Sequence, residues 1–418
     1  MTLIKNPYTI GRPVYAPEYL FGRETIVSFI QEQLTSRAKV IVLHGQRRIG
    51  MTSCMNYISR SVSVDEFVFV PLSLEDKHHY SLDEILYNFA GDIIDWLGIS
   101  RSRITIPTQE DFKVEPQRFV EILLEQIYDK LEGKNLVLLL DEFDVLWDNN
   151  STNINPFINL LSSIINQEKL FVILFIGRRG NSLEFIRYLF GKVSHKELGL
   201  LNKSDTEKLI TGIAEGVLEY EPEAIEAIWE LASGHPYYTQ LLCFNLFQRA
   251  RNQNRWNVSH EDVEEIIDVS LEQGEAAFVS SLEILSTQEK LILSAVAEAQ
   301  KIAIKSYKSN IVSPLMRLEI VILERYGRKL TQKMKEELTK AAEHLVDLGF
   351  LQQIGEQELG KNIIPVYKVK IELLRLWLLK RHSLKTEIET INKLFPQRSF
   401  IGQIWNSGPG KWMRSHSN

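Results

Sequence analysis

Residues 40–53 read VIVLHGQRRIGMTS, and this stretch decides the fold of the first half of the chain. The β-branched, apolar residues 38–44 predict a buried strand, and the pattern that follows the loop predicts a helix. Between them, Gly45 and Gly50 are separated by four residues, and Thr52 follows two positions later. This spacing agrees with the pattern G-x-x-x-x-G-K-[ST] everywhere except at Met51, which stands where the pattern has lysine. The stretch therefore predicts a strand, a phosphate-binding loop and a helix.

Each part of this loop has a physical reason. Glycines let backbone N–H groups turn toward phosphate oxygens, and the N-terminus of the following helix favours an anion. The hydroxyl of Thr52 is placed to ligate Mg²⁺. The expected cofactors are therefore ATP or ADP with Mg²⁺. The predicted nucleotide-binding residues of the loop are Gly45, Gln46, Arg47, Arg48, Ile49, Gly50, Met51, Thr52 and Ser53.

A second part of the predicted site follows the apolar run 136–140. Asp141 and Glu142 come directly after it, at the end of a strand where an α/β sheet places its chemistry. Asp141 would hold the Mg²⁺ ion through water, and Glu142 would polarise the attacking water as the catalytic residue. In isolation, two adjacent acids at a strand end would favour a solvated turn. Their combination with the loop at 45–52 favours a nucleotide site.

The surrounding sequence predicts an α/β fold with a parallel sheet. Strand-like runs at 67–72, 136–140 and 170–176 follow the first strand, and helical patterns at 24–34, 81–97, 116–132 and 155–167 alternate with them. Continuous apolar strands of this kind are buried on both faces by helices. We therefore expect a nucleotide-binding domain over residues 1–201, with an N-terminal segment on its adenine side.

Beyond Leu201 the strand signal stops. Helical periodicity at 204–216, 222–233, 235–251 and 259–272 predicts an all-α lid domain over residues 202–284. Helical patterns at 287–299, 331–347 and 371–382 flank a predicted hairpin, with strands 350–354 and 364–369 and a loop at 355–362. Helices followed by a two-stranded wing indicate a winged helix-turn-helix domain over 285–384. Residues 385–418 are expected to form a flexible tail.

Met51 removes a positive charge from the predicted site. A lysine there donates charge-assisted hydrogen bonds to the β- and γ-phosphates, each worth about 1.5–3 kcal/mol. Without it, nucleotide binding should weaken by roughly ten- to a hundredfold, and ATPase activity should be impaired. Two explanations are open: a natural pseudo-ATPase, or a deliberate substitution that keeps side-chain length and deletes charge. The retention of Thr52, Asp141 and Glu142 favours the second explanation.

These motifs resemble the STAND class of P-loop ATPases, in particular an archaeal-type branch related to the AAA-like origin-recognition ATPases. The resemblance covers roughly residues 6–385. It implies that Phe21, Gly22 and Arg23 lie beside the adenine and ribose, and that Arg178, after the fourth strand, reads the γ-phosphate as a catalytic sensor. It also implies that Pro236, in the motif GHPYY, closes over the base from the lid. Many relatives carry additional effector domains or sensor repeats; here we expect any effector or sensor to lie in a partner protein.

Three functions are compatible with these features. The first is a STAND-type ATP-dependent switch in signalling or defence, which forms a self-oligomer and recruits a protein effector or sensor in trans. The second is a DNA-binding ATPase of the initiator or transposition-regulator type that uses the winged helix. The third is a pseudo-ATPase scaffold that binds a protein partner.

The charge distribution bears on the partner. Residues 281–418 hold 22 basic and 14 acidic residues, a net charge of +8, whereas residues 1–280 carry −14. The basic part could bind DNA, through a cluster at 325–340, or could pack against the acidic part in a closed form. With 44% hydrophobic and 24% charged residues, only two cysteines and no apolar run of membrane-spanning length, we expect a globular, cytoplasmic protein with no membrane contact.

Overall fold

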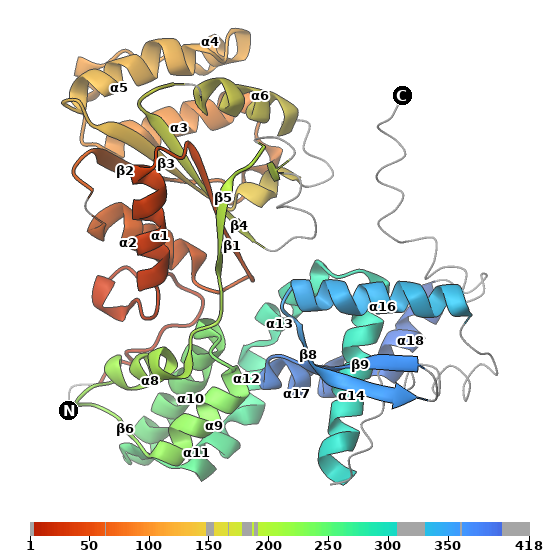
Figure 1. Ribbon diagram of the computed structural model, residues 1–418. Helices are drawn as coiled ribbons and strands as arrows, with labels where there is room; N and C mark the ends of the chain where they lie inside the picture. Colours follow the sequence, from red (N-terminus) through yellow and green to blue (C-terminus); the bar gives the residue numbers. More distant parts are fainter. Residues whose placement is uncertain are drawn as a thin grey trace. The chain divides into compact units, whose positions relative to one another are not determined.

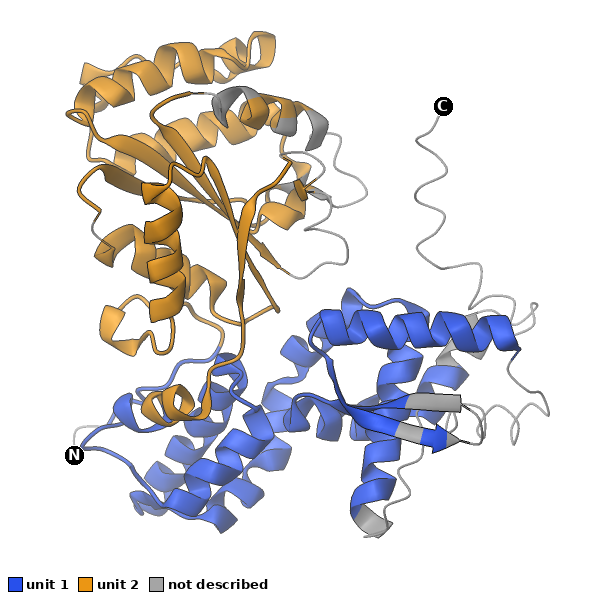
Figure 2. Ribbon diagram, viewed as in Figure 1, with its two compact units in different colours: residues 1–10, 210–418 blue, residues 11–209 orange. Residues whose placement is uncertain are grey.

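The computed structural model describes residues 4–62, 64–147, 154–165, 167–177, 186–187, 191–306, 331–359 and 362–394. The chain forms two compact units, coloured separately in Figure 2. Residues 11–209 form the first, which we call the sheet unit. Residues 1–10 and 210–418 form the second, which we call the helical unit.

The centre of the sheet unit is a five-stranded parallel sheet with the order β2-β3-β4-β1-β5 (Figure 1). This confirms the predicted parallel sheet and its four apolar strands. Because β4 lies between β1 and β3, the strand that leads into the glycine-rich loop is not the neighbour of the strand that ends in Asp141. The strands are β1 (Val40–Gly45), β2 (Phe67–Ser73), β3 (Asn135–Asp141), β4 (Leu170–Gly177) and β5 (Ser194–Leu198).

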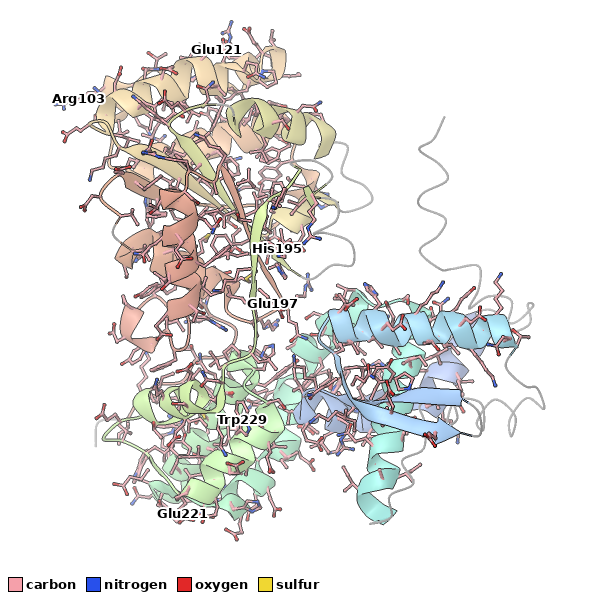
Figure 3. All side chains as sticks on the ribbon, viewed as in Figure 1. Arg103, Glu121, His195, Glu197, Glu221 and Trp229 are labelled. Carbon is pink, nitrogen blue, oxygen red and sulfur yellow. The ribbon has the colours of Figure 1, made fainter. Side chains whose placement is uncertain are left out.

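The edge strand β5 is absent from the sequence-based prediction. Its first four residues alternate between partly buried and exposed positions and only the last, Leu198, is buried; Figure 3 labels the exposed His195 and Glu197 on this strand. An edge strand has one neighbour only, here β1, so it needs no continuous apolar run. The hydrophobic pattern that identifies the other strands is therefore missing from this one.

Helices cover both faces of the sheet. Val42, Leu138 and their neighbours face a hydrophobic cluster with α3 to α6, while Ile41 and Leu139 face another with α1 and α2. The helices are α1 (Glu24–Thr35), α2 (Met51–Ser61), α3 (Leu82–Trp96), α4 (Gln109–Val114), a π-helical segment η4 (Phe119–Leu124), α5 (Glu125–Lys130) and α6 (Ile154–Ile165). Short 3₁₀ turns are η1 (Pro17–Tyr19), η2 (Lys77–His79), η3 (Arg101–Arg103) and η5 (Phe143–Trp147).

Helix α8 (Lys203–Gly212) leads from the sheet unit into the helical unit. The predicted helical patterns after Leu201 are confirmed, although the pattern at 259–272 is interrupted near Ile266. The remaining elements are β6 (Glu219–Tyr220), α9 (Pro222–Ala232), α10 (Pro236–Gln253), β7 (Asn257–Val258), α11 (His260–Glu265), α12 (Ile267–Gln273), α13 (Glu275–Glu283), α14 (Thr287–Ser306), α16 (Gln332–Asp347), β8 (Leu351–Leu359), β9 (Asn362–Val369), α17 (Glu372–Arg381) and α18 (Leu384–Leu394).

A column of aromatic rings joins the two segments assigned from sequence to the lid and the winged helix. The ring of Phe278 stacks on Tyr238 at 5.0 Å and on Trp377 at 5.2 Å between centroids. Lys380 also forms an ion pair with Asp268. Stacked rings add to the hydrophobic gain of burial. Residues 202–284 and 285–384 therefore share packing within one compact unit.

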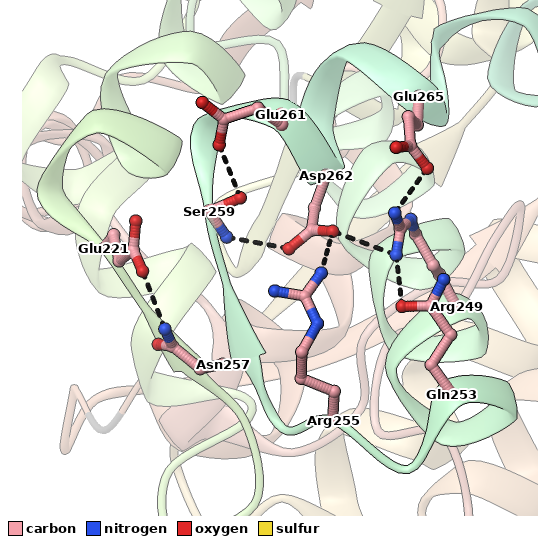
Figure 4. A network of polar contacts seen from close by, with 9 residues as sticks. All are labelled: Glu221, Arg249, Gln253, Arg255, Asn257, Ser259, Glu261, Asp262 and Glu265. Atoms are coloured by element: carbon pink, nitrogen blue, oxygen red, sulfur yellow. Dashed lines mark hydrogen bonds and ion pairs between the residues drawn. The ribbon is translucent and has the colours of Figure 1, made fainter.

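A buried carboxylate fixes the connection between α10 and α11 (Figure 4). Asp262 accepts a hydrogen bond from the Ser259 backbone N–H at 2.9 Å and pairs with Arg249 at 2.9 Å and with Arg255. A buried charge is tolerated when its oxygens are satisfied in this way. This network holds the short strand β7 in place before α11 begins.

The hairpin and the tail differ from the prediction. The strands β8 and β9 pair antiparallel to Leu359 and Asn362, so most of the predicted loop at 355–362 is strand. Backbone pairing extends them, and exposed residues such as Glu356 carry no apolar signal. Residues 385–394 of the predicted tail form most of α18, because Leu384 and Ile388, four residues apart, are both buried.

The predictions of a basic DNA-binding cluster and of a flexible tail concern segments that the structure describes only in part. Residues 307–330, which include the first part of the basic cluster at 325–340, and the tail from 395 onward lie outside the described residues. The helix-turn-helix assignment depends on the first of these segments, so it stays a prediction.

The first residues of the chain belong to the helical unit, whereas the sequence analysis groups them with residues 11–201. Tyr8 is 1% exposed, and its hydroxyl donates to the Ile210 carbonyl and shares a 2.8 Å hydrogen bond with Tyr220. The amide of Asn6 donates to the Phe244 carbonyl at 3.1 Å. A buried tyrosine with a satisfied hydroxyl is a strong anchor, and nothing in the periodicity of such a short segment predicts it.

Within the described parts of the chain, no helix has both the length and the hydrophobicity that crossing a bilayer requires.

Candidate nucleotide site

The two glycines of the loop are required for different reasons. A Cβ at Gly45 would lie 2.6 Å from the backbone carbonyl oxygen of Leu198, which cannot move aside. Gly50 has φ +97° and caps the N-terminus of α2, a backbone conformation that side chains disfavour. A side chain is thus excluded at position 45 by a steric clash and disfavoured at position 50 by the backbone conformation.

The side chain of Ile49 anchors the loop between these glycines to the hydrophobic core. Ile49 is fully buried in the hydrophobic cluster under α1 and α2, and its N–H donates to the Gln46 carbonyl at 3.3 Å. Arg47 and Arg48 are exposed, and Arg48 has φ +62°. The loop thus anchors its apolar residue in the core and places Arg47 and Arg48 at the surface of the protein.

Thr52 and Asp141 meet across the site. The Thr52 hydroxyl, in the first turn of α2, donates to Asp141 Oδ2 at 2.7 Å. Asp141 is 4% exposed, and its other oxygen accepts the backbone N–H of Glu142 at 3.0 Å. Although β3 and the loop come from strands that are not neighbours, this bond brings the two predicted halves of the site into contact.

Burial raises the pKa of the Asp141 carboxyl, an effect that the hydrogen bonds from Thr52 and from the Glu142 backbone oppose. The carboxylates of Glu75 and Asp144 raise this pKa further. The site therefore holds negative charge at a cost, which a cation bound there would remove.

Glu142 is exposed, in contrast to Asp141, and has φ +51°. A non-glycine residue in this left-handed region marks a sharp turn directly after β3. Partial desolvation raises the pKa of its carboxyl, as do Asp141, Glu75 and Asp144, while Arg47 opposes the shift. Such a raised pKa suits a group that takes a proton from water.

Asp144 is a site residue that the sequence analysis did not single out. It is buried, and its Oδ1 accepts the backbone N–H of Gly177 at 3.1 Å. A Cβ at Gly177 would lie 3.1 Å from its other carboxylate oxygen. Asp144 thus ties the end of β4 to the segment after β3, and the repeat of acids in DEFD is the only signal for it in the sequence.

Met51 is partly buried and packs at the edge of the cluster that contains Ile49. A lysine stem could follow the same apolar path and place its ammonium group in solvent. The position therefore accommodates a long unbranched side chain independently of its charge.

Residues 21–24, with the sequence FGRE, contact the loop through Arg23. Its guanidinium donates to the carbonyl oxygens of Ile49 and Gly199, each at 2.9 Å. Gly22 has φ +65°, and Phe21 is partly buried beside it. The hydroxyl of Ser53 accepts the backbone N–H of Val14 at 3.0 Å, another contact that spacing does not predict.

Two residues of the predicted site, Arg178 and Pro236, are not among the described residues of the sheet unit. Arg178 follows β4 and lies outside the described residues. Pro236 belongs to the helical unit, where it is the first residue of α10. Their roles at the nucleotide stay predictions from the resemblance.

Comparison with known proteins agrees with this geometry. Residues 33–184 match the AAA domain family. The Walker-type ATPase PABY2304 of Pyrococcus abyssi has a similar structure, with a TM-score of 0.62 and 16% sequence identity over 88% of this chain and 99% of that one. At this identity the similarity establishes a common fold. No curated protein sequence matches the chain.

Other solved structures are more distant. The ORC1 protein of Aeropyrum pernix in complex with DNA has a TM-score of 0.40 and 16% identity over 90% of this chain and 96% of that one. The RuvB Holliday junction branch migration motor of Thermotoga maritima has a TM-score of 0.39 and 15% identity, with 82% and 92% covered. The match of residues 33–184 to the AAA domain and the fold shared with the Pyrococcus protein agree with the predicted P-loop, AAA-like fold.

The raised pKa of Asp141 leads to a test without any ligand. The folded protein retains the Asp141 proton to a higher pH than the unfolded chain, whose carboxyl has a pKa near 3.8. The ionised carboxylate therefore lowers stability at neutral pH, and this cost disappears as the pH falls toward 3.8. Asp141→Asn should raise the Tm of the metal-free protein at pH 8 by about 2–4 °C, and by less at pH 4.5. Scanning calorimetry in EDTA at the two pH values measures this, and an equal change at both would contradict it.

Proposed function

We propose that this protein binds ATP and Mg²⁺ at residues 45–53 and Asp141, and that the nucleotide controls its assembly with itself or with a partner. The hydrogen bond between Thr52 and Asp141 carries the proposal. It brings a hydroxyl and a buried carboxylate together at the N-terminus of α2, at the position that the loop motif reserves for the metal.

The residues present fit both ligands. Mg²⁺ prefers oxygen ligands and retains water, and Thr52 Oγ1 and Asp141 supply two oxygens without a dedicated protein cage. The N–H groups in the first turn of α2, a helix of 11 residues, are free of intrahelical partners and favour a phosphate. When bound, Mg²⁺ would neutralise charge on the phosphates. Glu142 would orient water and accept its proton, and the exposed Arg47 and Arg48 would add positive charge.

The missing lysine leads to a test of this site. Met51→Lys should tighten binding of a fluorescent ATP analogue by roughly ten- to a hundredfold, since one charge-assisted interaction with the phosphates is restored. Fluorescence titration with Mg²⁺ and with EDTA measures the change, and a phosphate-release assay measures turnover.

Met51→Gln is the matched control, because it adds polarity without charge and should leave affinity within about threefold of the parent. Turnover that stays at background in Met51→Lys, with Glu142 intact, would favour the pseudo-ATPase scaffold. If Met51→Lys fails to bind nucleotide even at millimolar concentration, the proposed site is wrong.

The finer proposal is a switch of the STAND type. The chain passes between the sheet unit and the helical unit at Ile10–Gly11 and again at Leu209–Ile210, so a nucleotide that changes either passage changes the freedom of the helical unit. The ATP form would be competent for assembly and the ADP form closed.

The double variant Met51→Lys, Glu142→Gln should bind ATP and hydrolyse it slowly, which traps the ATP form. Light scattering coupled to size-exclusion chromatography should show a larger particle with ATP than with ADP or without nucleotide. The Met51→Lys single variant should return to the small form as ATP is consumed. Identical particle sizes in all three conditions would contradict an assembly switch.

A DNA-binding ATPase is the second candidate, favoured by the net charge of +8 on residues 281–418. If this region binds phosphates, the affinity of the full chain for a labelled duplex should fall steeply between about 50 and 200 mM salt. Fluorescence anisotropy measures it. An absence of binding at about 50 mM salt would remove this candidate and leave closure against acidic residues as the role of the basic region.

A further inference from the structure

On the sheet-unit side of each passage, a nearby segment of the chain is tied to the phosphate loop or to the helix that follows it, once directly and once through Arg23. After the first passage, Val14 donates its backbone N–H to Ser53 in the first turn of α2. Before the second passage, the segment 199–209 is joined to the loop through Arg23. All of these contacts lie within the sheet unit.

Arg23 makes the second connection with one planar group. Its side chain is 6% exposed, and the two terminal nitrogens donate to the carbonyl oxygens of Ile49 and Gly199 at 2.9 Å each. Burial lowers the pKa of the guanidinium, an effect that Cys54, Asp205 and Glu24 oppose. Burying this cation costs free energy, and two backbone acceptors in a fixed fork geometry compensate for it. A lysine has no such fork.

The geometry of the peptide bond links this contact to the phosphate site. In a trans peptide the C=O and the following N–H point in opposite directions. Because the Ile49 carbonyl points to Arg23, the N–H of Gly50 points away from it. A phosphate oxygen that accepts this N–H would polarise the peptide and make the Ile49 carbonyl a stronger acceptor. A ligand that accepts the Gly50 N–H therefore strengthens the hydrogen bond between the Ile49 carbonyl and Arg23, because both groups belong to the same peptide.

The start of α8 also touches the turn that carries Arg23. Gly22 has φ +65°, and a Cβ there would lie 2.7 Å from the Asp205 carboxylate. Asp205 is held by its own backbone N–H, which donates to the side chain of Asn202 at 2.8 Å. The turn at 22–23 thus contacts the segment 199–209 at two places, Gly199 and Asp205.

We infer that Arg23 is a positioning residue that couples occupancy of the phosphate loop to the segment 199–209. Through its two carbonyl contacts, a bound nucleotide restrains the chain that leads into α8 and the helical unit. Val14 and Ser53 form a separate connection to the N-terminal passage. This inference rests on the proposed nucleotide site and adds to it the route by which the site acts.

Hydrogen exchange measured by mass spectrometry on the full chain tests the route. In the Met51→Lys protein, saturating Mg²⁺ and ADP should slow amide exchange in residues 199–209 and at Val14, each by about two- to tenfold, the range expected for strengthening one hydrogen bond. Arg23→Lys should lose the slowing at 199–209 and keep it at Val14. Ser53→Ala should show the reverse. A purely structural role for Arg23 would alter both segments alike, with or without nucleotide.

Arg37→Lys is the matched control, since Arg37 is an exposed arginine of the same unit that pairs with Glu66 at 2.9 Å. It should keep both responses. If nucleotide binds to Met51→Lys but exchange in 199–209 is unchanged, the inference fails, and this measurement needs no variant at Arg23. If no nucleotide binds, the proposed function itself fails. Retention of the full response at 199–209 in Arg23→Lys would also overturn the role assigned to Arg23.

Discussion

The burial of both faces of a parallel sheet is the constraint on which the rest of this structure depends. The central strands are buried along almost their whole length and are mostly apolar, so polar chemistry has room only where the strands stop. The carboxyl ends of β1, β3 and β4 lie at one edge, where Gly45, Asp141 and Gly177 mark the change from core to site. The hydrogen bond between Thr52 and Asp141 is possible because the same core positions both strands.

The electrostatics of the site follow from that placement. Asp141 is carried to the rim of the core and is therefore desolvated, and Asp144 and Glu75 add negative potential around it. Arg47 acts on Glu142 from the loop, but Met51 contributes no charge. In the absence of ligands, the site therefore has an excess of negative groups, and it is better suited to a metal-bound nucleotide than to a free anion.

Sequence reasoning succeeded where one signal dominates. Continuous apolar runs predict the strands β1 to β4, and glycine spacing predicts the loop with Thr52 in register. It missed β5, whose residues are those of an exposed edge. It also missed contacts through backbone atoms, because the carbonyls that Arg23 binds and the N–H that Asp144 accepts have no side-chain signature. Tyr8 was missed for a related reason, since its partners are distant in sequence and one of them is a carbonyl group.

The steric difference between Gly45 and Met51 has a consequence for how such a site can change over time. At position 45 any side chain would meet the Leu198 backbone, so substitution there disturbs the end of the sheet as well as the loop. At position 51 the side chain lies at the margin of the core, where charge can be removed while the packing is retained. A substitution at position 51 can therefore change the charge beside the loop while the protein stays folded. Gly45, in contrast, preserves the close packing between the start of the loop and the end of β5.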